Sequence, residues 1–395
     1  MVSTVYLGAP GIICALGSRC DEVAARLFGQ TAAAGVAATD ACSAGRSLAL
    51  GRVQEPLPAL EDFAVPLRSR NNALLAAAYA QVRPQVEAAI ARYGATRVAV
   101  VVGTSTSGIG EAELALPTLL ADGRWPEGFH YAQQEIGAPS RFLAQLAGVA
   151  GPAWTLSTAC SSSAKALASA ARLLRAGIVD AVIAGGADAL CAFTVSGFSA
   201  LEAVSPARCN PFSRNRSGIN IGEGAALFLM TREPGPVRLA GWGETSDAHH
   251  MSAPEPQGQG ASAAIAQALA RAGIAGSALD YVNLHGTATR HNDAMESLAM
   301  HASGLAAVPA SSTKPLTGHA LGAAGAIEVA LCWLTMTHNP QRWLPPHWWD
   351  GEADPALPAL DLVAPGRRAA APLRYILSQS FAFGGSNAAL LLGEG

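Results

Sequence analysis

Charged side chains are scarce in this sequence, at 14% of 395 residues, and their formal net charge is only −3 at pH 7. A net charge this small and negative provides no global basic field to hold nucleic acid or an anionic membrane surface. The sequence also lacks an apolar run of about 18 residues free of charges and chain breakers, which a membrane-spanning helix needs. We therefore expect no nucleic acid partner and no membrane span, and any acidic protein partner must meet a local basic patch.

Paired cysteines and a secretory leader are missing as well. The seven cysteines are odd in number and form no C-x-x-C pair, which argues against a disulfide framework or a structural zinc site. The N-terminal segment MVSTVYLGAP lacks the basic region that precedes a secretory apolar stretch. We expect a reducing, cytoplasmic location and no resident metal.

The sequence does contain an alternation of apolar strand-like runs with alanine- and leucine-rich helical stretches. Half of its residues are hydrophobic, enough for two ordinary domains or one large duplicated fold. The alternation predicts a layered α/β fold. It restarts after about residue 236, so the chain divides into halves at 1–235 and 236–395. Strand-like runs lie within residues 2–9, 97–108, 180–190, 237–244 and 280–289, and predicted helices cover 73–94, 165–177, 261–273 and 327–336.

One segment interrupts this pattern. Residues 339–358, NPQRWLPPHWWDGEADPALP, have turn-forming chemistry at almost every step. We expect a surface loop here rather than a linker between domains.

Cys160 is the candidate nucleophile. It lies in TLSTACSSSAKALASAARLLRA, where an apolar strand is followed by small residues and then by a helix that begins at or just after the cysteine. Unpaired N–H groups and the helix dipole stabilise a thiolate at such a position. The alternative is an inert buried thiol, the common state of a free cysteine. No G-x-S-x-G segment is present, which disfavours a serine hydrolase.

Two further segments each carry a histidine, LHGTATRHNDAMES with His285 and SSTKPLTGHALGAAGAIE with His319. A nucleophilic thiol and two imidazoles form a credible acyl-transfer set, although either histidine alone is better explained by a core or loop position. The glycine spacing after His319 does not fit a dinucleotide-binding loop. The set His285, His291, Asp293 and Glu296 has no metal-ligand spacing.

The ordered motifs STACSSS, NPFSRNRSGINIGEGA, HGTATRHND, STKPLTGHALGAAGA and SQSFAFGGSN resemble those of β-ketoacyl-acyl carrier protein synthases of the elongating Cys-His-His type. The resemblance covers essentially the whole chain. It implies a thiolase fold, in which two duplicated βαβαβαββ halves stack in five αβαβα layers, with the site between the halves. It also implies a two-carbon chain extension by decarboxylative Claisen condensation of malonyl-carrier with an acyl group held on the cysteine.

The same resemblance assigns roles to residues of this chain. Cys160 would carry the acyl group, and His285 and His319 would bind the malonyl thioester and promote loss of CO₂. An ion pair of Lys314 with Glu328 would orient the histidines. The N–H groups of Cys160 and Phe383 would form the oxyanion hole, Thr287 and Thr289 would bind the phosphopantetheine arm, Phe381 and Ile109 would line the acyl pocket, and Phe383 would gate it. Carrier docking would fall to Arg68, Arg70 and Arg208.

Substrates would arrive on the phosphopantetheine of an acyl carrier protein, with no separate cofactor. Two departures from the family pattern stand out, Ala382 where Gly is common and Asn210 where Arg or Lys is common. In some relatives, residues at the positions of Asn292 and Glu296 help to order a structural monovalent cation.

Related classes are distinguished by their motifs. Degradative thiolases have a second cysteine near the C-terminus, and initiating synthases have Cys-His-Asn. A non-catalytic chain-length factor, the main alternative, usually lacks the cysteine found here at Cys160. We expect a stand-alone enzyme, since the chain starts at its first strand and ends shortly after Asn387. It would act as a homodimer or as a heterodimer with a chain-length factor, and the motif forms look closest to a branch that includes aryl-polyene synthases.

Overall fold

The computed structural model describes residues 4–29 and 35–395, and residues 1–3 of the predicted first strand lie outside this part. The N-terminal half is built on a βαβαβαββ order, as the resemblance implied. Its elements are β1 (Tyr6–Leu7), α2 (Arg70–Tyr93), β5 (Val98–Gly103), α4 (Ala138–Ala147), β6 (Ala153–Leu156), α5 (Ser162–Arg175), β7 (Ala181–Asp188) and β8 (Gly224–Thr231).

The C-terminal half repeats the same order. Its elements are β9 (Val237–Ser246), α7 (Gln259–Ala272), β10 (Tyr281–Asn283), α8 (Arg290–Ala302), β11 (Ala310–Ser311), α10 (Ala324–Thr337), β12 (Tyr375–Phe381) and β13 (Ser386–Glu394). The division predicted between residues 235 and 236 falls in the connection between β8 and β9.

The strand pairing has the same pattern in both halves. The N-terminal strands are ordered β1-β8-β7-β5-β6, and the C-terminal strands follow the matching order β9-β13-β12-β10-β11. In each half three strands run parallel and the last strand of the repeat pairs antiparallel with its neighbour. Strand β1 pairs with both β8 and β9, so the two sets of strands are joined.

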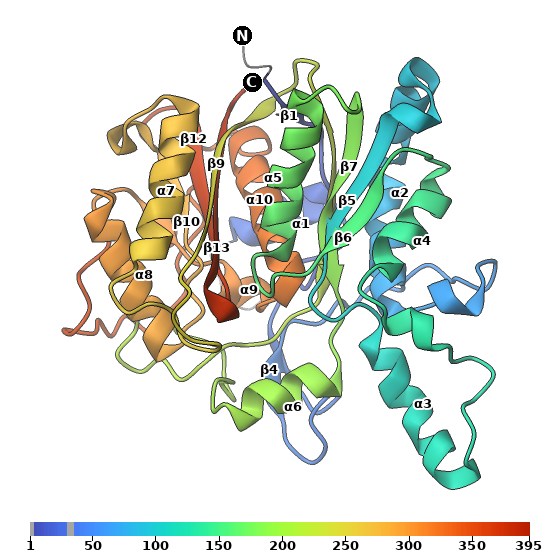
Figure 1. Cartoon of the computed structure of the whole chain (residues 1–395). Helices are drawn as coiled ribbons and strands as arrows, with labels where there is room; N and C mark the ends of the chain where they lie inside the picture. The colour runs from blue at the N-terminus through green and yellow to red at the C-terminus, as the bar shows by residue number, and fades with distance from the viewer. Residues whose placement is uncertain (1–3, 30–34) are drawn as a thin grey trace.

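The elements stack in five layers (Figure 1). Helices α2 and α4 cover the outside of the N-terminal strands, and α7 and α8 lie outside the C-terminal strands. Helices α5 and α10 pack against each other between the two sets. Their close approach requires Gly325, because a Cβ there would meet Ala164 at 2.8 Å. This confirms the predicted thiolase fold.

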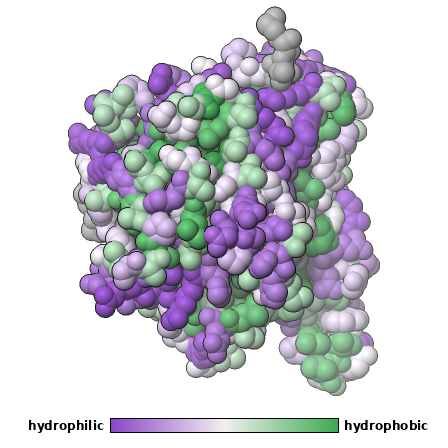
Figure 2. Space-filling view, turned by 60° about the vertical axis from the view of Figure 1, so that its left-hand side comes forward, coloured by the Kyte–Doolittle hydropathy of each residue, from purple (hydrophilic) through white to green (hydrophobic). Residues whose placement is uncertain are grey.

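Further elements decorate this framework. Helix α3 (Ile109–Asp122) projects from the body, and α6 (Ala192–Ala200) packs against it. Figure 2 shows apolar side chains gathered on that projection at its lower right. The remaining elements are β2 (Gly11–Cys14), α1 (Cys20–Leu27), β3 (Ala37–Thr39), β4 (Leu48–Leu50), α9 (Lys314–Thr317) and the 3₁₀ turns Val65–Leu67, Ala95–Arg97, Tyr131–Gln134, Gly276–Ala278, Leu321–Ala323 and Phe383–Gly385.

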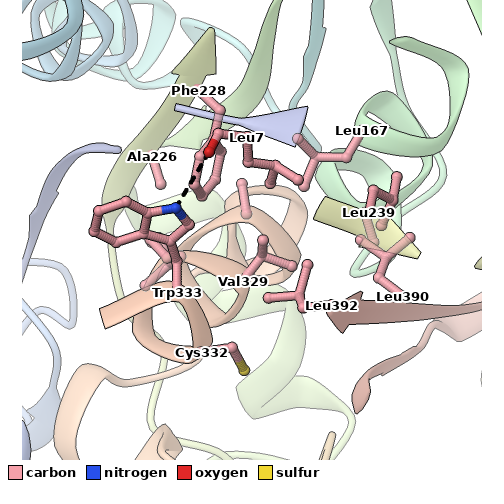
Figure 3. Packing of buried hydrophobic residues seen from close by; sticks show 14 of the residues in the cluster. Leu7, Leu167, Ala226, Phe228, Leu239, Val329, Cys332, Trp333, Leu390 and Leu392 are labelled. Carbon is pink, nitrogen blue, oxygen red and sulfur yellow. Dashed lines mark hydrogen bonds between the residues drawn. The ribbon is translucent and has the colours of Figure 1, made fainter. Parts of the chain in front are cut away.

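The central core joins the two halves. Side chains from β1, α5 and β8 meet side chains from β9, α10 and β13 in one buried cluster (Figure 3). Within it, Trp333 donates a hydrogen bond to the backbone oxygen of Leu7. Removing a large apolar side chain from such a core costs about 2–5 kcal/mol, so this cluster holds the two halves in a fixed relation around the site.

The prediction for residues 339–358 is only partly right. This segment, all of it described, forms no helix or strand, yet residues 344–347 are buried. The turn-rich composition concealed an apolar Leu-Pro-Pro step that packs inward, which makes the segment part of the interior. None of the helices in the described ranges is long and apolar enough to cross a bilayer.

Candidate active site

Cys160 lies on a tight turn between β6 and α5. The preceding residue, Ala159, adopts a left-handed backbone with φ of 52°. The Ser162 hydroxyl accepts from the Thr158 N–H at 2.8 Å and donates to the Ala159 carbonyl at 2.6 Å. The small side chains in STACSSS therefore permit and fix a sharp turn that places the sulfur between the halves.

Both predicted histidines meet this cysteine. His319 Nε2 lies 3.0 Å from Cys160 Sγ, and the rings of His285 and His319 are 5.3 Å apart, edge to face. One ligand atom from each of the three residues lies within 4.8 Å of the others. Cysteine and histidine also bind zinc, but a metal cation here would share the site with the positive charge of Lys314. The arrangement suits acyl transfer.

The Lys314 ammonium fixes the tautomer of His285. Lysine has donors only, and its Nζ lies 3.4 Å from His285 Nδ1, so this nitrogen accepts and Nε2 carries the proton. Glu328 accepts a buried ion-pair hydrogen bond from the same ammonium. The predicted pair of Lys314 with Glu328 therefore lies directly behind His285.

Burial governs the protonation of the site. It raises the pKa of the Cys160 thiol to about 12, although Lys314 and the N–H groups of Phe383 and Cys160 act in the opposite direction. Burial and Lys314 lower the pKa of His285 and of His319 well below the ordinary value. The expected preformed thiolate is therefore not favoured, because α5 starts two residues after the cysteine and the sulfur is shielded from water. A neutral thiol beside neutral imidazoles is the resting state.

The backbone around His285 is held by a buried carboxylate. Glu296 accepts the N–H groups of His285 and Gly286, both at 2.7 Å. Burial raises the pKa of Glu296 to about 8. This side chain orders backbone in the described structure, which is a different role from the metal ligand considered for it in the sequence.

A second carboxylate, Asp188, links the two halves at the site. It lies at the end of β7 and is fully buried. Its oxygens accept the Gly322 N–H at 2.6 Å, three residues beyond His319. They also accept hydrogen bonds from Thr104, Ser105 and Thr106 in the connection before α3. Asp188 thus ties the His319 segment to the N-terminal half.

One cavity of about 1020 Å³ is faced by Cys160, His285 and His319. Thr287 and Thr289 line it, and their hydroxyl oxygens are 3.0 Å apart. Phe381 and Phe383 line it as well. The other lining residues are Phe198, Leu201, Glu202, Ala203, Arg214, Asn215, Arg216, Ser217, Gly218, Ile219, His250, Ser252, Ala253, Pro254, Arg290, His291, Asn292 and Ala382.

Phe383 places both its backbone and its ring at the nucleophile. Its N–H group lowers the pKa of the Cys160 thiol, against the effect of burial, and its ring lies 5.5 Å from that of Phe198. The next residue, Gly384, donates its N–H to the Met251 carbonyl at 2.9 Å. The loop therefore has an N–H group at the nucleophile and an aromatic ring over the cavity.

Ile109 does not join this group. It is the first residue of α3 and is not among the residues that line the described cavity. Its predicted contact with an acyl chain therefore requires a pocket beyond the one that contains Cys160.

The three arginines predicted to dock the carrier are not among the residues that line this cavity. Arg70 forms a two-pronged ion pair with the buried Glu223, and Arg68 donates to two backbone carbonyls at 2.7 and 2.8 Å. Arg208 is half-buried and its nearest acceptor is the carbonyl of Val36. Arg214 and Arg290 instead lie at the cavity and are exposed. The sequence offered a signal for Arg290, because this residue directly follows the HGTAT motif.

Comparison with known proteins agrees with this geometry. The sequence matches the family Beta-ketoacyl synthase, N-terminal domain over residues 74–234 and Beta-ketoacyl synthase, C-terminal domain over residues 237–347. The chain belongs to the β-ketoacyl synthase family. This confirms the resemblance and the predicted acyltransferase class.

Individual relatives of this β-ketoacyl synthase are similar over most of their length. The 3-oxoacyl-[acyl-carrier-protein] synthase 2 of Vibrio cholerae is 31% identical over 317 residues, 75% of this chain and 76% of that protein. Nodulation protein E of Rhizobium meliloti is 34% identical over 315 residues, 76% and 75% of the two chains. The ketosynthase ApeO of Xenorhabdus doucetiae, solved in complex with its chain length factor ApeC, has 46% identity and a TM-score of 0.94, covering 100% of this chain and 98% of that one.

Proposed function

We propose that this chain condenses malonyl-carrier with an acyl group held on Cys160, releasing CO₂ and extending the chain by two carbons. The observation that carries the proposal is the convergence of Cys160, His285 and His319 on one cavity lined by Thr287 and Thr289. A chain-length factor without catalysis has no need of this convergence, so the enzymatic reading is favoured.

Acylation begins at the neutral thiol. His319 Nε2 accepts the Cys160 proton while the sulfur attacks the acyl thioester carbonyl. The N–H groups of Cys160 and Phe383 stabilise the oxyanion, and one such donor supplies about 2.7–4 kcal/mol in a well-measured case. The carrier thiolate leaves and takes up the proton from His319, so the acyl–sulfur bond moves from carrier to enzyme.

Decarboxylation follows when malonyl-carrier replaces the first carrier. Once Cys160 is acylated and has no proton to donate, His319 can carry its proton on Nε2. The Nε2–H groups of His285 and His319 then bind the malonyl thioester carbonyl and stabilise the enolate as CO₂ leaves. The enolate carbon attacks the acyl carbonyl on Cys160, the C–S bond breaks, and the cysteine thiolate leaves. A proton from solvent then reaches this thiolate through His319 and restores the neutral thiol. Lys314 with Glu328 keeps His285 in the donating tautomer.

The substrate arm enters past the arginines at the cavity mouth. Thr287 and Thr289 would bind the phosphopantetheine amides, and the exposed Arg214 and Arg290 add positive charge to the cavity lining. We infer that these two arginines contribute more to carrier docking than Arg68, Arg70 and Arg208, because they line the cavity and the other three do not. Arg214 has one ion-pair contact, with the exposed Glu352 at 3.9 Å, whereas Arg70 is held by the buried Glu223 and Arg68 by two backbone carbonyls.

We infer that the partner of this chain is a chain-length-factor-like subunit. The support is the similarity to a ketosynthase solved with its chain length factor and the apolar surface of α3, where Leu114 and Leu120 are 78% and 77% exposed. Phe193 of the adjacent α6 is exposed on the same side. The aryl-polyene branch and the cytoplasmic location remain proposals from the sequence.

The proposal is tested with purified chain, its partner subunit and carrier-bound substrates. Mass spectrometry should detect one acyl group on Cys160, and ¹⁴CO₂ release should report malonyl decarboxylation. Cys160→Ala should lower condensation by about a thousandfold or more and remove the acyl adduct. Acylation of another residue with full condensation in this variant would refute the assignment.

A further inference from the structure

His347 is a buried titratable group that the reaction above does not use. It belongs to the Pro- and Trp-rich segment 339–358, and its side chain is only 1% exposed. Its backbone N–H donates to Val363 at 2.8 Å, so the residue is fixed in the interior. A histidine placed this deep requires partners for both ring nitrogens.

Both nitrogens have such partners, and these define one tautomer. The Ser312 N–H lies 3.1 Å from Nδ1 and can only donate, so Nδ1 accepts. The Pro211 carbonyl lies 3.0 Å from Nε2 and can only accept, so Nε2 carries the proton. Burial lowers the pKa of His347 to about 4, which keeps the ring neutral. Its charged neighbours are one step removed: Asp293 accepts from the N–H of Phe212, and Lys314 lies two residues beyond Ser312.

The two segments joined by His347 enclose the residue next to His285. The Ser312 hydroxyl donates to the Gly286 carbonyl at 2.7 Å. A Cβ on Gly286 would lie 2.5 Å from Ser312 and 3.1 Å from the ring of Phe212, which follows Pro211. Gly286 has φ of 38°, so its conformation is held by the packing on both sides. The spacing between Ser312 and Phe212 therefore sets the backbone that carries His285.

We propose that His347 is a positioning residue for His285, acting by bridging Ser312 and Pro211. This inference rests on the proposed role of His285 in decarboxylation. His347 touches no substrate. Its removal leaves a buried N–H and a buried carbonyl without partners, which allows the two segments to separate and Gly286 to shift.

Three substitutions divide the bridge into its two bonds. His347→Asn places an amide oxygen near the Nδ1 position and retains the bond from Ser312. His347→Gln places an amide nitrogen near the Nε2 position and retains the bond to Pro211. His347→Phe keeps the ring and loses both. We expect His347→Phe to slow malonyl decarboxylation by roughly ten- to a hundredfold, since a displacement of about 1 Å can cost about a hundredfold. His347→Asn should retain a higher rate of malonyl decarboxylation than His347→Gln, because Ser312 is the partner that donates a hydrogen bond to Gly286.

The control is Leu344→Ala, in the same segment and 2% exposed, whose side chain packs in the central core. It should lower stability without a selective loss of decarboxylation. Alkylation of Cys160 by iodoacetamide should stay within twofold of wild type in His347→Phe, because the cysteine belongs to the other half. Equal losses of alkylation and decarboxylation in both variants, or unchanged decarboxylation in His347→Phe, would overturn the inference.

A second readout does not depend on the reaction. The ¹⁵N resonances of the His285 ring should shift in His347→Phe and remain in place in Leu344→Ala. If wild-type enzyme fails to decarboxylate malonyl-carrier, the proposed function fails while the resonance shift still decides the positioning role. Unshifted His285 resonances in His347→Phe would exclude that role.

Discussion

The two halves of this synthase share one strand order but carry different chemistry in corresponding connections. Between β6 and α5 the connection is residues 157–161, and it places Cys160 directly before the helix. Between β11 and α10 it is residues 312–323, long enough to hold α9 and then His319. The longer connection allows one repeat to supply Lys314 behind the site and His319 in front of it.

A second pair of connections differs in the same way. The connection after β10 carries His285, whereas the connection after β5 supplies Thr104, Ser105 and Thr106, which bind Asp188. In the proposed reaction the N-terminal half provides the nucleophile and scaffolding, and the C-terminal half provides the acid–base groups. Because these contributions are separate, substitutions can remove one and leave the other.

Substitution of the histidines should separate acylation from decarboxylation most strongly. His285→Ala should lower malonyl decarboxylation by about 10²–10⁴-fold while Cys160 is still acylated, because the cysteine proton goes to His319. His319→Ala should slow both half-reactions. Rapid-quench mass spectrometry of the acyl-enzyme and CO₂ release measure the two steps. Acylation lost as completely as decarboxylation in His285→Ala would contradict this division.

A smaller effect is expected where the halves are tied together. In Asp188→Asn an amide nitrogen replaces one of the two oxygens. It then faces the N–H groups of Ser105 and Thr106 or those of Ser105 and Gly322, so hydrogen bonds become repulsive contacts in either orientation. We expect the free energy of unfolding to fall by roughly 1–3 kcal/mol, and acylation and decarboxylation to slow together because His319 loses its tether. Denaturant unfolding and the two half-reactions measure this.

Ser105→Ala is the matched control for the tether, since it removes one donor to Asp188 and leaves Gly322 bonded. It should have a smaller effect on both steps. An Asp188→Asn variant that retains wild-type rates would show that the His319 segment is positioned without this link.

These comparisons also show what the sequence could and could not predict. Local periodicity was enough for the repeat, and motif chemistry was enough to select Cys160, His285 and His319. Long-range pairing was not accessible: Arg70 was predicted to dock the carrier, and nothing near it in the sequence indicates its partner Glu223, which lies 153 positions away. His347 was hidden in the same way, because turn-forming neighbours indicated a surface loop while its partners are in other segments.

A several-fold effect is expected at the cavity mouth. Arg214→Glu and Arg290→Glu should raise KM for carrier-bound substrates at low salt, with little change for a small thioester analogue. The difference should shrink as salt rises. Arg68→Glu is the control, since its guanidinium is bonded to backbone carbonyls away from the cavity. A larger effect from Arg68→Glu than from the rim arginines would return carrier docking to the surface predicted from the sequence.

The last prediction concerns the pH dependence of stability, and it separates His347 from its neighbours. His347 has a pKa of about 4 in the folded protein and an ordinary value of 6.5, so unfolding takes up a proton between these pH values. Stability from this group is complete above pH 6.5 and is lost as pH falls toward 4, by at most about 3 kcal/mol. Asp293 acts in the opposite direction, because burial raises its pKa to about 6.

The difference between wild type and His347→Asn isolates the histidine: the variant's unfolding free energy should depend less steeply on pH between 6.5 and 4, by up to one proton. Leu344→Ala, which removes no titrating group, should instead lower stability by a similar amount at every pH. Urea unfolding at a series of pH values measures both slopes, and an unchanged slope in His347→Asn would mean that His347 does not stay neutral in the folded protein.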